Sequence, residues 1–183
     1  MFRIYVERKI ERTFVSEKII FDFLNANRIE YELFKHQPVF TTEEKPVLID
    51  SDVETIPGMH SKTLFLKDKN GVFFLVSVTE DKRVDLKALS VLLGCGRLSF
   101  GKPEELFELL KLRPGSVTPF GLIFDQQQKI IFILDKDFAS ASFVNFHPLR
   151  NDMTITLAPV QFLSCMEKLD HKPRIITVPV KEN

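Results

Sequence analysis

Three separate segments of this 183-residue sequence carry groups that could take part in chemistry. The first, Gly58-Met59-His60-Ser61-Lys62, leads directly into an apolar run. Lys62 shares one face of an extended chain with Leu64 and Leu66, so its ammonium group must reach solvent, pair with an acid or face a ligand. For an isolated lysine the solvent-facing position is the default interpretation.

The second segment is the short loop Gly115-Ser116-Val117-Thr118-Pro119. A loop that begins with glycine and ends with proline presents its backbone N–H groups in a fixed shape. The alternative interpretation is a tight connection between two elements, with no functional role.

The third segment is Phe143-Val144-Asn145-Phe146-His147-Pro148-Leu149-Arg150-Asn151. Strand alternation places Phe143, Asn145 and His147 on one side, with Val144 and Phe146 on the other. Pro148 ends the strand, so His147 sits at a strand exit, a position well suited to lining a pocket. Taken alone, this histidine is better explained by structural hydrogen bonding.

Several common devices of catalysis and cofactor binding are absent from the sequence. It contains no P-loop, GxGxxG, HExxH or GxSxG motif. The four histidines are scattered and the two cysteines lack CxxC spacing, which disfavours a metal site, a zinc ribbon and a disulfide scaffold. Cys165 lies between apolar residues of an amphipathic stretch, which indicates a core position rather than a nucleophile. We expect no metal and no cofactor.

Composition limits the choice of partners. Lys plus Arg and Asp plus Glu each number 25, so the formal charge is zero, and binding of nucleic acid through bulk positive charge is disfavoured. A local basic patch stays possible. There is no apolar run long enough to cross a membrane, and the N-terminus lacks the apolar block of a signal peptide. We therefore expect a cytoplasmic protein without membrane contact.

The spacing of apolar and turn residues predicts the elements that carry these segments. Asn70-Gly71 between two apolar runs predicts a hairpin of strands 62–68 and 72–78. Four helices are expected: one capped by Ser16 and ending near Asn27, one after the cap Asp85 and closed by Gly94, one opened by Pro103, and one opened by Pro159. Further strands are expected at 29–35, 122–124, 130–134 across a polar turn at 125–129, 142–146, 153–157 and 174–178, and Thr41 or Thr42 could cap a short helix.

This order predicts an α+β (mixed α/β) fold with a central mixed, largely antiparallel sheet, partly barrel-like, flanked by helices. Residues 16–180 are expected to form a single domain. Residues 1–15 form an N-terminal extension, either an extra strand or a segment packed on the main body.

Four fragments together resemble the YbaK/ProX family of trans-editing aminoacyl-tRNA deacylases, which are related to the insertion domain of bacterial prolyl-tRNA synthetase. The fragments are HQPVFTTEE (36–44), PGMHSKTLFLKDKNG (57–71), PGSVTPFGL (114–122) and FVNFHPLRN (143–151). Each is short, but the combination is distinctive and the resemblance runs from about Ser16 to Val178. The closest likeness is to ProX-type alanyl-tRNA(Pro) deacylases.

The resemblance implies roles for particular residues. Lys62 matches the functional lysine of the family, Gly115 to Pro119 match its GxxxP loop, and His147 matches its pocket histidine; these give Lys62, Gly115 and His147 as the catalytic residues. The substrate would contact Thr63, Ser116, Val117, Thr118, Pro119, Phe146 and Asn151. ProX-type proteins carry Asn where this chain has Thr63, whereas YbaK-type relatives, which act on cysteinyl-tRNA(Pro), tend to carry Thr.

The resemblance implies hydrolysis of mischarged aminoacyl-tRNA(Pro), most of all Ala-tRNA(Pro), without a metal and with help from the terminal 2′-hydroxyl. Backbone N–H groups of the Gly115 loop would stabilise the oxyanion, and Lys62 would supply positive charge near the ester or the terminal phosphate. Two alternatives stay open: the same reaction on Cys-, Ser- or Thr-charged tRNA, and a non-catalytic module that binds tRNA or associates with a synthetase.

The implied partners are tRNA and prolyl-tRNA synthetase. The RNA would need a local basic surface, for which the candidates are Arg3, Arg8, Lys9, Arg12, Lys67, Lys69 and Arg150. Phe40 and Phe146 are candidate stacking partners, although with 18 phenylalanines a core position is the better interpretation of each.

Overall fold

The computed structural model describes residues 17–38, 46–49 and 53–181. The expected extension at 1–15, the helix cap Ser16, the short helix at Thr41 or Thr42 and the candidate stacking residue Phe40 lie outside these ranges.

The described helices and strands follow one another in a mixed order. They are α1 (Lys18–Ala26), β1 (Glu32–Lys35), β2 (Met59–Asp68), β3 (Phe73–Thr79), α2 (Leu86–Leu92), β4 (Leu98–Phe100), α3 (Pro103–Leu110), the 3₁₀ helix η1 (Pro119–Phe124), β5 (Ile130–Asp135), the 3₁₀ helix η2 (Lys136–Ser140), β6 (Val144–Phe146), β7 (Met153–Leu157), α4 (Pro159–Lys168) and β8 (Arg174–Ile176).

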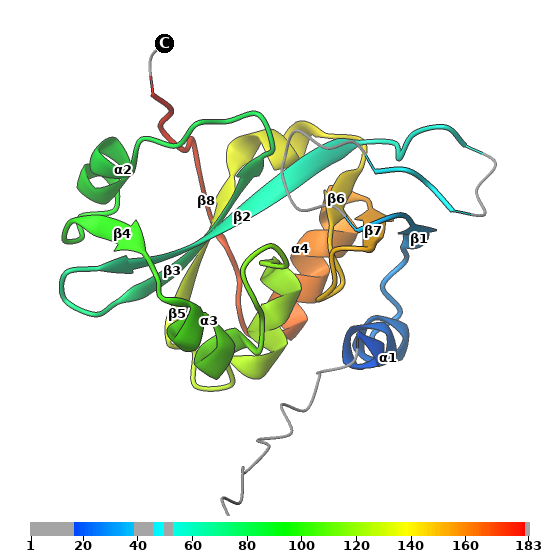
Figure 1. Cartoon of the computed structure of the whole chain (residues 1–183), viewed down its shortest axis with the longest axis horizontal. Helices are drawn as coiled ribbons and strands as arrows, with labels where there is room; N and C mark the ends of the chain where they lie inside the picture. Colours follow the sequence, from blue (N-terminus) through cyan, green and yellow to red (C-terminus); the bar gives the residue numbers. More distant parts are fainter. Residues whose placement is uncertain (1–16, 39–45, 50–52, 182–183) are drawn as a thin grey trace, which may run out of the picture.

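One eight-stranded sheet organises these elements, in the order β1-β7-β6-β2-β3-β5-β8, with β4 paired to a second stretch of β2 (Figure 1). Antiparallel pairs join β1 to β7, β7 to β6, β2 to β3 and β2 to β4. Parallel pairs join β6 to β2, β3 to β5 and β5 to β8. The predicted mixed α/β class is confirmed, but the sheet is open rather than partly barrel-like, because the outer strands β1 and β8 do not pair with each other.

The hairpin of β2 and β3 forms where the sequence predicts it. Gly71 has a positive φ of 89°, which its missing side chain permits. The carboxylate of Asp68 accepts hydrogen bonds from the backbone N–H groups of Asn70 and Val72, at 2.8 and 2.9 Å. The turn is therefore held by a side chain as well as by glycine, and it fixes the register of the whole hairpin.

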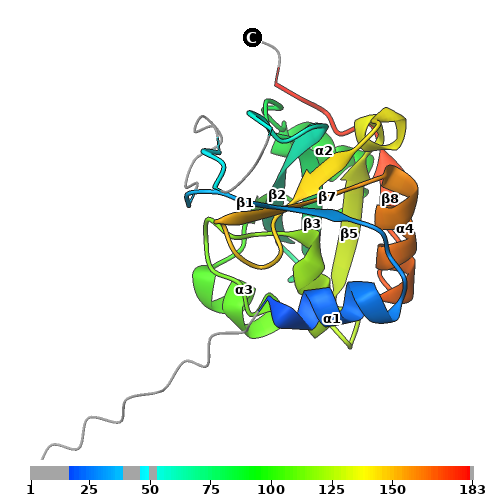
Figure 2. The same cartoon turned by 90° about the vertical axis from the view of Figure 1, so that its right-hand side faces the viewer.

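Two apolar clusters cover the two faces of the sheet. The larger contains side chains from α1, α3, η1 and α4, and many of its members are phenylalanines. The smaller lies on the other face, where Leu89 of α2 and Val178 pack against Leu66, Val76 and Ile133. In Figure 1 α2 and β4 lie at one end of the molecule and α1 and β1 at the other, and Figure 2 shows α1 and α4 on adjoining sides of the sheet.

The predicted helix ends are largely confirmed. Asp85 caps α2 by accepting from the N–H groups of Lys87 and Ala88, and Pro103 and Pro159 open α3 and α4. At α1, however, the residue in the N-cap position is Glu17, one residue after the expected Ser16.

The prediction of a strand at 122–124 is wrong, because these residues belong to the 3₁₀ helix η1. Thr118 lies at its N-cap, where its side chain accepts from the N–H of Phe120, and Pro119 supplies a fixed φ at the first position. The hairpin expected across 125–129 is therefore absent, and β5 pairs in parallel with β3 and β8 instead.

Candidate functional site

Strand β6 connects the three segments that carry the candidate residues. Its Val144 and Asn145 pair with Met59 and His60 at the start of β2, just before Lys62. Its last residue, Phe146, packs edge-on against Phe120 of η1, which follows the Gly115 loop, with ring centres 6.2 Å apart. His147 comes directly after the strand. A three-residue strand therefore links the lysine, the loop and the histidine.

Asn145 fixes the chain that leads to Lys62. Its side-chain amide donates to the carbonyl oxygen of Pro57 at 3.0 Å and its Oδ1 accepts from the hydroxyl of Thr156 at 2.5 Å. The hydroxyl of Ser61 donates to the backbone carbonyl of Asn145 at 2.6 Å. These three hydrogen bonds hold both ends of the segment 57–61 against β6.

Gly58 allows this segment to approach β6 closely. Its φ is 96°, and a Cβ built at this position would lie 2.7 Å from both the Cβ and the carbonyl oxygen of Phe143. Any larger residue would therefore push the segment away from Phe143, and with it the start of β2.

Lys62 is half-buried, and its Nζ donates to the carbonyl oxygen of Glu80 at 2.8 Å. Burial lowers the pKa of Lys62, and the positive charge of Arg83 acts in the same direction; the negative charges of Asp81 and Glu80 oppose it. The ammonium group is thus held by a neutral acceptor, which leaves its charge available to a further anion.

Thr63 lies at an open edge of β2. The hydrogen-bonded pairs His60–Glu80 and Asp68–Val72 show that even-numbered residues of β2 direct their backbone groups toward β3, so Thr63 directs its N–H and C=O the other way. On that side β6 pairs only with 59–60 and β4 only with 66–68. No described strand pairs with Thr63 on that side, and its hydroxyl lies 2.9 Å from that of Ser77.

The Gly115 loop is held by hydrogen bonds at both ends. Gly115 has a φ of 87° with open space around it, and Ser116 donates its N–H to the carbonyl of Arg113 at 3.1 Å. Val117 packs against the larger apolar cluster, while Thr118 and Pro119 are buried and begin η1. The N–H groups of Gly115, Val117 and Thr118 donate to no other described residue, so the loop has free donors.

His147 is oriented by the backbone. Its Nδ1 lies 2.8 Å from the carbonyl oxygen of Met153, which can only accept, so Nδ1 carries the proton and Nε2 presents a lone pair. Burial lowers the pKa of His147, assisted by His36 and His60 and opposed by the Met153 hydrogen bond and Asp152. Burial therefore favours the neutral form of the ring.

His36 is a neighbour that the sequence analysis did not select. It follows β1 as His147 follows β6, and both strands run antiparallel to β7, so both histidines meet the start of that strand. His36 is 1% exposed, its Nδ1 donates to the carbonyl of Gln37, and its Nε2 accepts from the hydroxyl of Thr154 at 3.0 Å. The signal for His36 in the sequence was its place at the start of HQPVFTTEE, one of the four fragments that carry the family resemblance.

Comparison with known proteins gives the chain its family. The model of the aminoacyl-tRNA editing domain matches residues 36–165, a stretch that contains His36, Lys62, Gly115 and His147. The chain belongs to this family, which is the YbaK/ProX family. The resemblance drawn from the four sequence fragments is therefore confirmed.

Relatives of this editing domain cover most of its length. It is 33% identical over 158 residues to prolyl-tRNA synthetase associated domain-containing protein 1 of Danio rerio, covering 85% of this chain and 84% of that protein. It is 35% identical over 136 residues to the prolyl-tRNA editing protein ProX of Acetoanaerobium sticklandii, covering 74% and 80%. A crystal structure described as a candidate trans-editing enzyme for prolyl-tRNA synthetase has the same fold, with a TM-score of 0.68 at 20% identity over 92% of this chain and 99% of that one.

The editing domain holds Phe146 in its core. The ring is 2% exposed and stacks on Phe162 with centres 4.3 Å apart, so in this structure it presents no face to a nucleic-acid base. Asn151 is half-buried in the turn between β6 and β7. Among the described residues, no three histidine, cysteine or acidic side chains form a candidate metal site, and no described helix is long and apolar enough to span a membrane.

Two of the cations expected to contact RNA are neutralised. Arg150 pairs with Asp152 and Glu17, and Lys67 pairs with Glu105 while lying over the ring of Phe73. The basic surface of the described chain lies elsewhere, at a hollow of about 890 Å³ that includes Lys62 but neither Gly115 nor His147. This surface was missed because its cations are spread over distant parts of the sequence.

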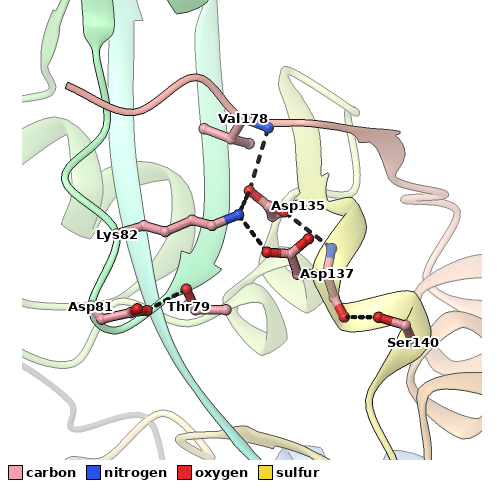
Figure 3. A network of polar contacts seen from close by, with 7 residues as sticks. All are labelled: Thr79, Asp81, Lys82, Asp135, Asp137, Ser140 and Val178. Carbon is pink, nitrogen blue, oxygen red and sulfur yellow. Dashed lines mark hydrogen bonds and ion pairs between the residues drawn. The ribbon is translucent and has the colours of Figure 1, made fainter. Parts of the chain in front are cut away.

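One lysine of that hollow has a structural role. Lys82 forms ion pairs with Asp135, at 2.8 Å, and with Asp137, at 2.7 Å (Figure 3). Asp135 is fully buried and also accepts from the N–H groups of Asp137 and Val178. The network joins the turn after β3 to the end of β5 and to the chain after β8. It therefore stabilises the ends of these three strands.

Proposed function

We propose that this editing domain hydrolyses the ester of mischarged aminoacyl-tRNA(Pro), with Ala-tRNA(Pro) as its preferred substrate. The observation that supports the proposal is the position of strand β6, which pairs with the residues before Lys62, contacts Phe120 after the Gly115 loop and leads into His147. Membership of the editing family supports it, and so do the names of the relatives, which refer to prolyl-tRNA editing and to association with prolyl-tRNA synthetase. The proposed partners are accordingly tRNA(Pro) and, in the cytoplasm, that synthetase.

The proposed reaction needs no nucleophilic side chain. A water molecule attacks the ester carbonyl carbon, the bond from this carbon to the ribose oxygen breaks, and the ribose oxygen takes up a proton. The products are the free amino acid and uncharged tRNA. The neighbouring 2′-hydroxyl of the terminal ribose assists by orienting the water and passing the proton, which requires the enzyme mainly to position the groups.

Stabilisation of the developing negative charge is assigned to the loop and the lysine. The free N–H groups of Gly115 and Val117 suit an oxyanion, since preformed donors need no rearrangement during the reaction. Lys62, whose ammonium group is held by the neutral carbonyl of Glu80, would supply a positive charge. It lies beside Thr63, with which no described strand pairs on the side away from β3. His147, with a neutral ring, would orient the substrate through its Nε2.

Selection of alanine over proline follows from size under this proposal. A pocket too small for the proline ring excludes it by overlap, whereas a pocket that is merely too large discriminates by only about 1–3 kcal/mol per methylene. Thr63, whose hydroxyl pairs with Ser77, favours a second candidate within the family, the cysteinyl ester, because YbaK-type relatives tend to carry threonine here.

A panel of tRNA(Pro) charged with alanine, cysteine, serine, threonine or proline tests the proposal. We expect the purified protein to release alanine fastest and to leave prolyl-tRNA(Pro) intact. Faster release of cysteine would assign the second candidate. Binding of every charged tRNA without hydrolysis of any would contradict the enzyme assignment and favour a non-catalytic module.

A further inference from the structure

The hollow beside Lys62 is lined by several basic side chains and a single acidic one. Its wall comes from the Lys62 face of β2, the chain that opens α2, strand β4 and the C-terminal segment. The residues that line it are Lys62, Leu64, Lys82, Arg83, Val84, Asp85, Leu86, Lys87, Ser90, Arg97, Leu98, Phe100 and Lys181. We call this depression, defined by these residues, the basic hollow.

Most of the charge in the basic hollow has no internal partner. Asp85 is its single acid, and that carboxylate already accepts two N–H groups at the start of α2. Lys82 is neutralised by Asp135 and Asp137. No described residue forms an ion pair with the remaining cations, which are Lys62, Arg83, Lys87, Arg97 and Lys181. Glu80 and Asp81 lie near Lys62, and Asp81 accepts from the hydroxyl of Thr79.

An exposed aromatic ring borders these cations. Phe100, the last residue of β4, is 65% exposed although it lines the basic hollow. Most of the described phenylalanines are buried or half-buried, so a ring left this open is suited to stacking on a planar ligand. A basic groove with an aromatic platform is the arrangement that proteins use to hold single-stranded nucleic acid.

We infer that the basic hollow binds the single-stranded 3′ end of the tRNA. Arg83, Lys87 and Arg97 contact its phosphates, and the ring of Phe100 stacks on one of its bases. This inference rests on the proposed function, which sets the direction of the RNA chain. With the ester near Lys62, the nucleotides that precede the terminal one extend over the basic hollow. It also explains how a chain with a formal charge of zero binds RNA, since the unpaired cations are concentrated in one place.

Binding of an uncharged tRNA(Pro) transcript, followed by fluorescence anisotropy over a range of salt concentrations, tests the inference. The variant Arg83→Ala/Lys87→Ala/Arg97→Ala removes three cations of the basic hollow. The control Lys129→Ala/Lys136→Ala/Arg174→Ala removes three exposed cations that do not line it. We expect the first variant to raise Kd by at least about tenfold and to reduce the slope of log K against log salt by about 2, since each single-strand phosphate contact contributes about 0.7. The control should change neither.

A second pair of variants isolates the ring of Phe100. Phe100→Leu keeps an apolar side chain but removes the stacking face, and we expect a rise in Kd of about tenfold; Phe100→Tyr should bind like the wild type. A transcript without its single-stranded 3′ end should lose the difference between wild type and Phe100→Leu. The inference is overturned if the two triple variants bind equally, or if the shortened transcript retains that difference.

The same proteins separate this inference from the proposed function. Hydrolysis of Ala-tRNA(Pro) by the wild type is measured independently of binding. If no charged tRNA is hydrolysed, the proposed function fails, while the loss of RNA binding in the basic-hollow variants still supports the inference. If hydrolysis is observed but both triple variants bind alike, the inference alone fails.

Discussion

The imidazole rings of His36 and His147 lie 5.9 Å apart, centre to centre, at the ends of two strands that flank β7. Each ring donates from Nδ1 to a backbone carbonyl, that of Gln37 for His36 and that of Met153 for His147. Protonation of His147 would place a second proton on Nε2 in a partly buried site next to another imidazole. The arrangement therefore favours the neutral ring of His147.

This preference predicts a pH dependence of stability. Because the pKa of His147 is lowered in the folded protein, the unfolded chain binds a proton more readily. The free energy of unfolding should therefore fall as the pH drops below about 6.5, the ordinary histidine value, until the folded-state pKa is passed. His147→Asn keeps a donor to Met153 but does not titrate, so urea unfolding between pH 7 and 5 should show a smaller decline. Parallel curves for the two proteins would show that His147 does not titrate as described.

Gly58 should be intolerant of a side chain. In Gly58→Ala the new Cβ would lie 2.7 Å from Phe143 in addition to the cost of a positive φ, and we expect a loss of about 2–4 kcal/mol in the free energy of unfolding. Gly71→Ala is the matched control, because Gly71 has a φ of 89° with open space around it and should lose only about 1–2 kcal/mol. Equal losses, measured by urea unfolding, would mean that the segment can move away from Phe143 at no cost.

The ion pairs around the buried Asp135 (Figure 3) should contribute strongly to stability. Asp135→Ala leaves Lys82 with one ion pair and removes the acceptor of two backbone N–H groups, so we expect a loss of about 2–4 kcal/mol. Lys82→Met should lose less than Asp135→Ala, because the carboxylate keeps both of its N–H donors. Chemical denaturation of the two variants checks this order, and the reverse order would contradict it.

The two cysteines should differ sharply in reactivity. Cys165 is fully buried in the larger apolar cluster, and burial raises its pKa to about 12, so almost no thiolate forms at pH 8. Cys95 is partly exposed and its pKa is also raised, by burial and by Asp68, so it should react slowly. We expect a colorimetric thiol reagent to modify one cysteine in the folded protein and two in denaturant, with Cys95→Ala abolishing the native reaction. Rapid modification of both thiols in the native state would refute the buried position of Cys165.

Local patterns predicted most elements of this fold, because their signals lie within a few residues. Asn70-Gly71 marked the hairpin and Asp85 marked the start of α2. The sequence predicts a strand at 122–124 because a short apolar run is compatible with both a strand and a helix. In the structure the run belongs to a 3₁₀ helix, which is capped by Thr118. The parallel pairing of β6 with β2 depends on contacts between distant residues, which no local pattern encodes.

The candidate site residues stay a prediction from local segments. Lys62, the Gly115 loop and His147 were selected from their own segments, and the strand that connects them became visible only in the structure. The basic hollow was missed because Arg83, Arg97 and Lys181 belong to separate segments that come together only in the folded chain. Arg150 was selected instead, although its guanidinium is occupied by two carboxylates, which sequence spacing could not reveal.

The role of Lys62 in ester cleavage is the central claim, and single-turnover hydrolysis of Ala-tRNA(Pro) tests it most directly. Removal of the ammonium group by Lys62→Ala should leave the fold intact, since this group makes one hydrogen bond, to a carbonyl. The rate should fall at least about 100-fold, as expected when a charge-stabilising donor is lost, while Lys129→Ala, an exposed control, should match the wild type. Hydrolysis by Lys62→Ala at the wild-type rate would contradict the account.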